Sequence, residues 1–415
     1  MKTGKYYKWE VLALLWVAYL LNQADRQVFN TVLPAIRDTL SLTDTSVGLI
    51  ATVFNLFYAL MVPLGGWAGD RFSRKWVTTL AILFWSVATM FTGLASGVVM
   101  LVLMRSIATG GGEAFFGPAN YSLLGQYHTD TRARAMSIHQ TSYYVGVILA
   151  GWLAGHIADR LGWKYSFIIF GAAGVVWGIV MMLRLRDKTP VNEKAAVTDT
   201  QASKPGLLDG FKTVFTTPTA LMLTLGFSAF IFVITGYMTW VPAYLQEEFG
   251  QNQEMAGLHS MLWTYVAAFL GVLLAGTVSD KWGAKDHKVR MIIQGAGLIL
   301  GSLFLFFMGS ISTLWVLYMS FAGWGFFRAF FDANIYTVLY DVTPERLHAS
   351  CSSAMIMTGF AVGALAPVVL GAMKESMGSL TATFPLLGII WAVAGVALLA
   401  VARLRYQKDY DKINT

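Results

Sequence analysis

Long runs of apolar residues, separated by short polar connections, dominate the chain. About 20 apolar residues allow an α-helix to cross the hydrocarbon core of a bilayer, and twelve stretches are long enough. We therefore predict an all-α integral membrane protein with twelve transmembrane helices. The predicted spans cover residues 10–36, 44–69, 76–95, 97–124, 134–157, 164–184, 217–245, 254–278, 289–309, 312–341, 348–372 and 380–402.

The composition supports this class. Of the 415 residues, 56% are hydrophobic and 13% are charged, whereas about a quarter of the residues in soluble domains are charged. The sequence contains no Ser-His-Asp arrangement, no cluster of metal ligands and no phosphate-binding loop that follows a strand. The single cysteine, Cys351, offers no disulfide framework. We therefore expect no enzymatic activity, no cofactor and no bound metal.

Basic residues indicate the orientation in the membrane. Most of the 30 Lys and Arg residues lie at the N-terminus, in alternate connections between the spans, in the central segment and at the C-terminus. Because such residues accumulate on the cytoplasmic side, we predict that both termini are cytoplasmic and that the protein lies in the cell (inner) membrane. The first span is too long and too charged for a cleavable signal peptide. The net charge of +7 thus reflects topology, and we expect no nucleic-acid partner.

The chain divides into two similar halves. Residues 186–212 include the one long polar, Pro- and Ser/Thr-containing segment, so we predict a cytoplasmic linker between six-helix bundles at 1–185 and 213–415. Residues 113–124 resemble residues 328–339, and Leu-Pro at 33–34 parallels Val-Pro at 241–242. Parallel repeats of this kind place a substrate site near the bilayer midplane, between bundles that rock about it.

The segment 66–75 reads Gly-x-x-x-Asp-Arg-x-x-Arg-Lys between the second and third spans, and 276–285 repeats it weakly. On this signature, and over essentially its whole length, the chain resembles the major facilitator superfamily. The resemblance implies a cytoplasmic latch, in which a charge pair holds the halves together while the outer side is open. A solvated loop that merely follows the positive-inside bias is the alternative. The predicted latch residues are Gly66, Asp70, Arg71, Arg74, Lys75 and Asp280.

Ionisable residues inside predicted spans are candidates for function, because a charge near the bilayer centre costs at least ~2.5–3.5 kcal/mol on insertion scales. Asp25 and Arg26 lie near the middle of the first span. Glu113 follows three glycines in the fourth span, where a buried carboxyl group can load and release a proton. The alternative for each is a structural ion pair between the first and fourth helices, with Glu113 held by Arg105 or Arg26.

Two further arginines lie within spans. Arg105 precedes Glu113 by eight residues, so the two point about 80° apart on an α-helix unless the glycines add a bulge. Arg328 and Asp332 are four residues apart and share one face. Arg328 occupies the repeat position of Glu113, which predicts that they face each other across a central cavity. A guanidinium group there suits a carboxylate or phosphate, and an internal Arg328–Asp332 salt bridge is the alternative.

Uncharged and weakly basic groups complete the predicted binding site. His139 and Gln140 lie in the fifth span, Tyr121 in the fourth and Asn334 in the tenth. All can donate or accept hydrogen bonds to a polar substrate. Packing roles are the alternative for each of them.

Asn-x-x-Asp-Arg at 22–26 and Gly-Glu-Ala at 112–114, followed by Pro118, are similar to the signatures of the anion:cation symporters, which carry hexuronates, aldonates and sialic acid. The interval from Arg105 to Glu113 is one residue longer than is usual there. The resemblance implies that Asp25 and Glu113 are proton sites and that Arg26 or Arg105 engages the substrate carboxylate.

The Spinster lysolipid transporters also share Asp-Arg-Gln in the first helix and Gly-Glu-Ala in the fourth. We therefore expect proton-coupled symport of a small organic anion by a monomer in the bilayer, with transport of a lysolipid or similar amphipath as the alternative. A receptor or an enzyme is the least favoured class.

Overall fold

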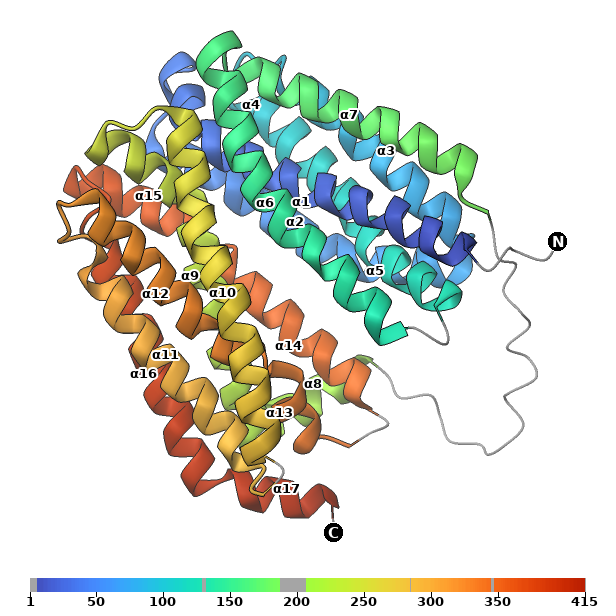
Figure 1. Ribbon diagram of the computed structural model, residues 1–415, viewed down its shortest axis with the longest axis vertical. Coiled ribbons are helices and arrows are strands. Elements are labelled where there is room, and N and C mark those ends of the chain that lie inside the picture. The colour runs from blue at the N-terminus through green and yellow to red at the C-terminus, as the bar shows by residue number, and fades with distance from the viewer. Residues whose placement is uncertain (1–5, 129–131, 187–206, 284, 345–346, 415) are drawn as a thin grey trace. The chain divides into compact units, whose positions relative to one another are not determined.

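The computed structural model describes residues 6–128, 132–186, 207–283, 285–344 and 347–414, and every regular element in these ranges is a helix (Figure 1). The helices are α1 (Tyr7–Thr39), α2 (Asp44–Arg71), α3 (Arg74–Thr92), α4 (Val98–Leu101), the π-helix η1 (Val102–Thr109), α5 (Gly110–Tyr127), α6 (Arg132–Leu161), α7 (Trp163–Arg184), α8 (Leu207–Thr216), α9 (Pro218–Phe249), α10 (Gln253–Gly283), α11 (Lys288–Met308), α12 (Leu314–Asp332), α13 (Ile335–Asp341), α14 (His348–Gly363), α15 (Ala366–Met377), α16 (Thr383–Leu404) and α17 (Tyr406–Asn414).

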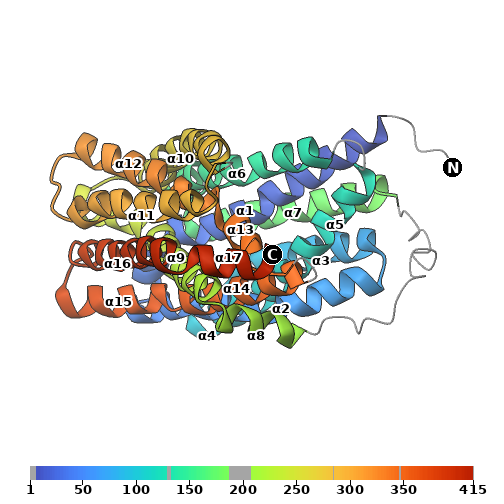
Figure 2. The ribbon, with the colours of Figure 1, turned by 90° about the horizontal axis from the view of Figure 1, so that it is seen from below.

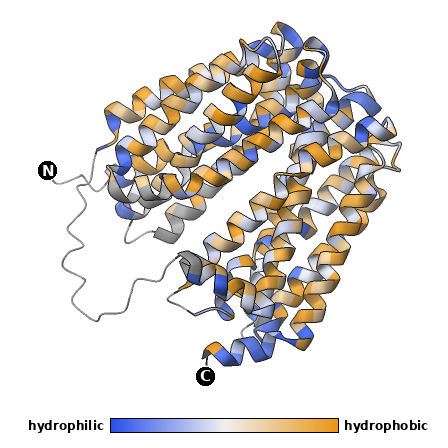
Figure 3. Cartoon of the chain, turned by 180° about the vertical axis from the view of Figure 1, so that it is seen from behind, coloured by the Kyte–Doolittle hydropathy of each residue, from blue (hydrophilic) through white to orange (hydrophobic). Residues whose placement is uncertain are grey.

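Within the described residues, ten helical segments are long and apolar enough to cross a membrane. The helices α1 and α6, with 33 and 30 residues, are also long enough but more polar. Figure 3 shows hydrophobic residues along the length of most helices and hydrophilic ones gathered at helix ends and connections. The predicted all-α membrane class is therefore confirmed, whereas the count of twelve transmembrane helices stays a prediction, because ten segments meet the criteria of length and apolarity among the described residues.

The helices form two compact units. The first contains α1 to α7 together with Val241–Leu258, which spans the end of α9 and the start of α10. The second contains α8, the rest of α9 and α10, and α11 to α17. In the second unit α11 lies alongside both α12 and α16, as two views show (Figures 1 and 2). The division into homologous bundles at 1–185 and 213–415 stays a prediction, and most of the predicted linker lies outside the described residues.

Three predicted spans are not uniform α-helices. The fourth begins as α4, continues as the π-helix η1 and ends as α5. The tenth is interrupted at Ala333 and Asn334, between α12 and α13, and the eleventh at Ala364 and Leu365, between α14 and α15. Apolar periodicity predicts the length of a span but not such changes of helix type, which depend on local hydrogen bonding.

The segment Val241–Leu258 is held against α1 and α6 within the first unit. Gly151 and Gly257 meet so closely that a Cβ atom on either would collide with the backbone of the other. The carboxylate of Asp159 accepts hydrogen bonds from the backbone N–H groups of Gln253 and Glu254, at 3.2 and 3.0 Å. It therefore satisfies two of the unpaired donors at the N-terminus of α10.

Candidate functional site

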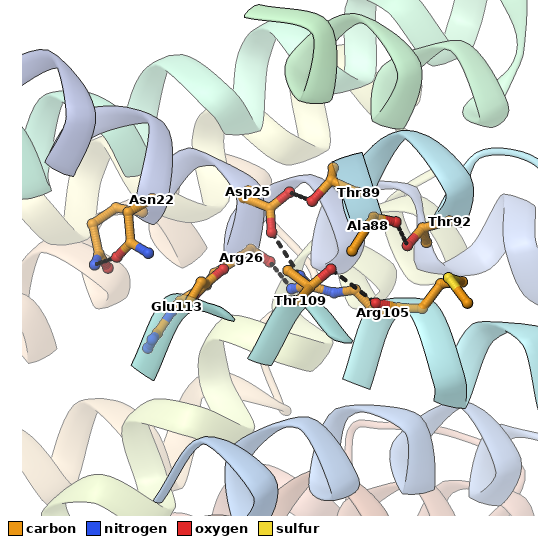
Figure 4. Close-up of polar contacts among 11 residues, drawn as sticks. Asn22, Asp25, Arg26, Ala88, Thr89, Thr92, Arg105, Thr109 and Glu113 are labelled. Atoms are coloured by element: carbon orange, nitrogen blue, oxygen red, sulfur yellow. Dashed lines mark hydrogen bonds and ion pairs between the residues drawn. The ribbon is translucent and has the colours of Figure 1, made fainter. Parts of the chain in front are cut away.

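Asp25 and Arg105 form an ion pair in the interior of the first unit (Figure 4). Arg105 Nη1 donates to Asp25 Oδ2 at 2.8 Å, and the Thr89 hydroxyl donates to Asp25 Oδ1 at 2.7 Å. Asp25 is 3% exposed and Arg105 is 4% exposed. The guanidinium group also lies over the ring of Phe54, with Cζ 4.4 Å from the centroid. Both charges are therefore enclosed by protein and compensated by each other.

Arg26 and Glu113 form a second ion pair between α1 and α5. Arg26 Nε donates to Glu113 Oε2 at 2.7 Å. The Glu113 side chain is fully buried, whereas that of Arg26 is 21% exposed. The Arg26 guanidinium group also lies over the ring of Tyr58, 4.3 Å from its centroid. Arg26 is thus the one member of the two pairs that combines a buried counter-ion with an exposed surface.

The π-helix η1 explains how both pairs can form on α1. In a continuous α-helix Arg105 and Glu113 would point about 80° apart. A π-bulge accommodates one extra residue, so the two are related by seven α-helical steps and point only about 20° apart. The Thr109 hydroxyl donates to the carbonyl oxygen of Met104, five residues earlier, at 2.9 Å. The π-helix η1 therefore supplies the bulge that is needed to align the Arg105 and Glu113 side chains. It ends just before the three glycines at the start of α5.

A group of aromatic and polar side chains, the Tyr19 cluster, lies further toward the N-terminus of α1. It comprises Tyr19, Asn120, Tyr121 and His139. The rings of Tyr19 and His139 stack at 4.8 Å between centroids, and Tyr121 packs edge-on to both. Asn120 Nδ2 and His139 Nε2 are 3.0 Å apart. Of the predicted binding residues, Tyr121 and His139 therefore come together here, while the Gln140 side chain lies outside the described residues.

The second unit contains the other predicted binding residues. The Arg328 guanidinium group lies over the rings of Tyr265 and Trp324, with Cζ 5.0 and 5.7 Å from the centroids. Asp332 is the last residue of α12, and Asn334 precedes α13 and donates to the Phe330 carbonyl oxygen at 3.2 Å. The predicted opposition of Arg328 to Glu113 stays a prediction.

The predicted latch falls largely on side chains outside the described residues, namely Gly66, Asp70, Arg71 and Asp280. Of its other members, Arg74 opens α3, and Lys75 Nζ lies 5.1 Å from the centroid of the Trp76 ring. The latch therefore stays a prediction.

Sequence reasoning missed two residues that contact the ion pairs. Thr89 on α3 donates a hydrogen bond to Asp25, and the Tyr58 ring on α2 lies against the Arg26 guanidinium group. Asn22, in the motif at 22–26, accepts a hydrogen bond from Gln23 at 2.8 Å. The polarity of Thr89 and Tyr58 within apolar spans was a weak signal. Single threonines and tyrosines are common in membrane helices for packing, so only the contacts distinguish these residues.

Two units of membrane-spanning helices, one of them with complementary charges buried at the centre of its first helix, define a polytopic membrane transporter. Residues 15–367 match the Major Facilitator Superfamily, and the chain belongs to this family. It is therefore a membrane transporter and not an enzyme. The predicted superfamily membership is confirmed.

Two relatives match over nearly the whole length of both chains, and a third matches over part of it. The chain is 25% identical over 402 residues to the hexuronate transporter of Bacillus subtilis strain 168, with 95% of each chain covered. It is 27% identical to the probable galactarate/D-glucarate transporter GarP of Escherichia coli K12, with 98% of each covered. It is 25% identical over 320 residues to the protein spinster homolog 1 of Xenopus laevis, covering 73% of this chain and 61% of the relative.

A solved structure shares the fold. The crystal structure of a bacterial homologue of the human lysosomal transporter Spinster, in an inward-facing and unoccupied conformation, superposes with a TM-score of 0.80. The two chains are 23% identical, with 99% of this chain and 98% of the other covered. The predicted resemblance to both groups of transporters is thus confirmed.

Proposed function

We propose that the protein is a proton-coupled symporter of a small organic anion, such as a hexuronate, an aldonate or sialic acid. The observation that carries this proposal is the partly exposed guanidinium group of Arg26, held by the buried carboxylate of Glu113. Relatives named for hexuronate and for galactarate or D-glucarate support the substrate class. We further propose that the protein lies in the inner membrane with both termini cytoplasmic.

Competition for Arg26 would couple proton and anion binding. While Glu113 is ionised, its carboxylate occupies the Nε side of the guanidinium group. When Glu113 takes up a proton, the charge attraction is lost and Arg26 becomes available to a carboxylate, which it can bind bidentately. The anion then replaces the charge that the proton removed, so the site is charge-balanced when both or neither are bound and unbalanced when only one is.

The second pair has a different role in this scheme. Asp25 and Arg105 are enclosed by protein, and we propose that they hold α1, α3 and the fourth span in register. Substrate contact is assigned to Arg26, with Arg328 as the proposed anion-binding group of the second unit. The proposed latch at 66–75 would stabilise one orientation of the two units during alternating access.

Purified protein in liposomes tests the proposal. An inward proton gradient should drive accumulation of labelled glucuronate, gluconate or sialic acid, and dissipating the gradient with a protonophore should abolish it. A lysophospholipid is included in the panel because Spinster-type transport is the second candidate, favoured by the superposition with the Spinster homologue. Uptake of the lysolipid with no uptake of any sugar acid would replace the first candidate by the second.

Glu113→Gln separates the coupling role from binding. Glutamine retains the shape and can hydrogen-bond Arg26 but cannot ionise, so accumulation driven by the proton gradient should stop while exchange of internal for external anion continues. Glu10→Gln is the matched control, because Glu10 pairs with Arg184 at 2.7 Å in a partly exposed position. Unchanged gradient-driven accumulation by the Glu113→Gln variant would refute the coupling role.

A further inference from the structure

One face of α1 and one ridge of α5 run together along the first unit. Tyr19 and Arg26 are seven residues apart on α1 and so point within about 20° of each other. On α5, Glu113, Gly117 and Tyr121 follow one another at four-residue intervals. The Arg26–Glu113 ion pair joins the two helices at one end, and the contact between the rings of Tyr19 and Tyr121 joins them at the other.

Gly117 opens a gap in the middle of this ridge. A Cβ atom at Gly117 would meet no heavy atom within 4 Å, whereas a Cβ atom at Gly110, Gly111 or Gly112 would press on phenylalanine or tryptophan. Four residues of α-helix rise about 6 Å, so Glu113 and Tyr121 each lie about one turn from the open space at Gly117. Figure 4 shows Asn22 and Glu113 on the neighbouring helices at the charged end.

Three buried polar atoms belong to residues on the same stretch of α1 and α5, with Glu113 and Asn120 on either side of Gly117 in the sequence and Asn22 between Tyr19 and Arg26. Among the described residues, Asn22 Nδ2, Glu113 Oε1 and Asn120 Oδ1 have no hydrogen-bond partner. The three residues are 4%, 1% and 0% exposed. Buried polar groups are nearly always hydrogen-bonded, and each exception calls for an explanation. One donor and two acceptors along this stretch match the hydroxyl groups of a ligand, each of which can donate and accept.

On the basis of the proposed function, we propose that the strip from Arg26 past Gly117 to Tyr121 binds the neutral, polyhydroxylated part of the anion. Arg26 holds the carboxylate, and the buried amides of Asn22 and Asn120 pair with hydroxyl groups. The Tyr19 and Tyr121 rings form the far end, where the Tyr121 hydroxyl group hydrogen-bonds the end of the ligand. Gly117 is then a specificity-determining residue, because its missing side chain sets the room for the carbon chain beyond the carboxylate.

The test compares a six-carbon aldonate with a three-carbon one, which share the carboxylate and differ in the length of the hydroxylated chain. Binding is measured by thermal shift on the purified full-length chain. The wild type should bind the longer anion at least about tenfold more tightly, as expected for one or two additional hydrogen bonds. Equal affinity for the two would overturn the proposal, and binding of neither would refute the proposed function itself.

Gly117→Leu introduces a branched side chain at the point where a Cβ atom meets no heavy atom within 4 Å. It should abolish the preference for the six-carbon anion while affinity for the three-carbon anion stays within about twofold of wild type. Gly276→Leu is the matched control, since a Cβ atom there also meets nothing within 4 Å. Wild-type preference in Gly117→Leu, or equal loss of both anions by a folded, monodisperse variant, would overturn the assignment.

Tyr121→Phe provides a second variant that keeps the ring packing. Tyr121 is 37% exposed, so loss of its hydroxyl group should leave the fold intact. The dissociation constant for the six-carbon anion should rise about five- to tenfold, as expected for one hydrogen bond, while that for the three-carbon anion should not change. An unchanged value for the longer anion would show that the far end of the strip is not occupied by substrate.

Discussion

The buried pair of Asp25 and Arg105 allows a quantitative test of the assignment of roles. Asp25→Asn removes the charge of one buried residue from a balanced group of four, comprising Asp25, Arg26, Arg105 and Glu113. Breaking a buried ion pair by removing one partner typically costs about 3–5 kcal/mol, because the other charge is left without compensation. We expect the free energy of unfolding to fall by an amount in this range. Asparagine can keep the hydrogen bond from Thr89 but cannot balance the charge of the Arg105 guanidinium group.

The double variant Asp25→Asn/Arg105→Gln removes both charges and leaves two amides that can hydrogen-bond each other. Replacement of a whole buried pair is often nearly neutral, so most of the lost stability should return. The exposed pair of Glu10 and Arg184 is the matched control, and Glu10→Gln should cost no more than about 1 kcal/mol.

Reversible unfolding in detergent, titrated with SDS, gives the free-energy differences for the single, double and control variants. The reasoning would be refuted by a double variant that loses as much stability as the sum of the losses in Asp25→Asn and Arg105→Gln. The two residues would then act independently, and Arg105 would be open again to a direct role in binding the anion.

Two further predictions concern packing and pH. Gly151→Ala should destabilise the protein and loosen Val241–Leu258, because the new Cβ atom would collide with the Gly257 backbone, which cannot move aside. Gly276→Ala is the control and should be neutral, because a Cβ atom there meets nothing within 4 Å. Equal melting temperatures for the two variants would contradict the close approach of Gly151 and Gly257. Tyr406→Phe removes a 2.7 Å hydrogen bond to Asp341 and should cost about 1.5–3 kcal/mol near neutral pH. Burial, with the hydrogen bond to Asp341, raises the pKa of Tyr406 above its usual 10.0. Above pH 10 the unfolded chain therefore loses this proton before the folded chain does, and the free energy of unfolding of the wild type falls. The difference in free energy of unfolding between the wild type and Tyr406→Phe should then narrow. A difference that widens above pH 10 would contradict the raised pKa.

The membrane class and most helix positions could be predicted because apolar run length is a direct consequence of bilayer thickness. The predicted span 10–36, for example, is the core of α1, and 164–184 is nearly all of α7. The ends differ by a few residues since polar side chains continue a helix beyond the apolar stretch. The interruption at Ala333 and Asn334 could not be predicted, because no proline marks it.

The candidate site could be predicted as a set of residues but not as a set of pairs. The cost of burying charge identified Asp25, Arg26, Arg105 and Glu113, and the sequence left several pairings open. Which acid meets which base depends on the register of α1 against the fourth span, and therefore on the π-helix. The exposure that distinguishes Arg26 from Arg105 is likewise a property of packing, which a single sequence does not encode in any visible pattern.

The π-helix also bears on how this chain should be compared with its relatives. Because η1 takes up one residue without turning the helix that follows, a transporter with one residue fewer between the two charged positions can present both of them in the same direction. A gap in the middle of a membrane span, which would ordinarily be read as an alignment error, is here a difference in helix type. An ungapped alignment of this chain with such a relative would instead pair either Arg105 or Glu113 with the wrong residue.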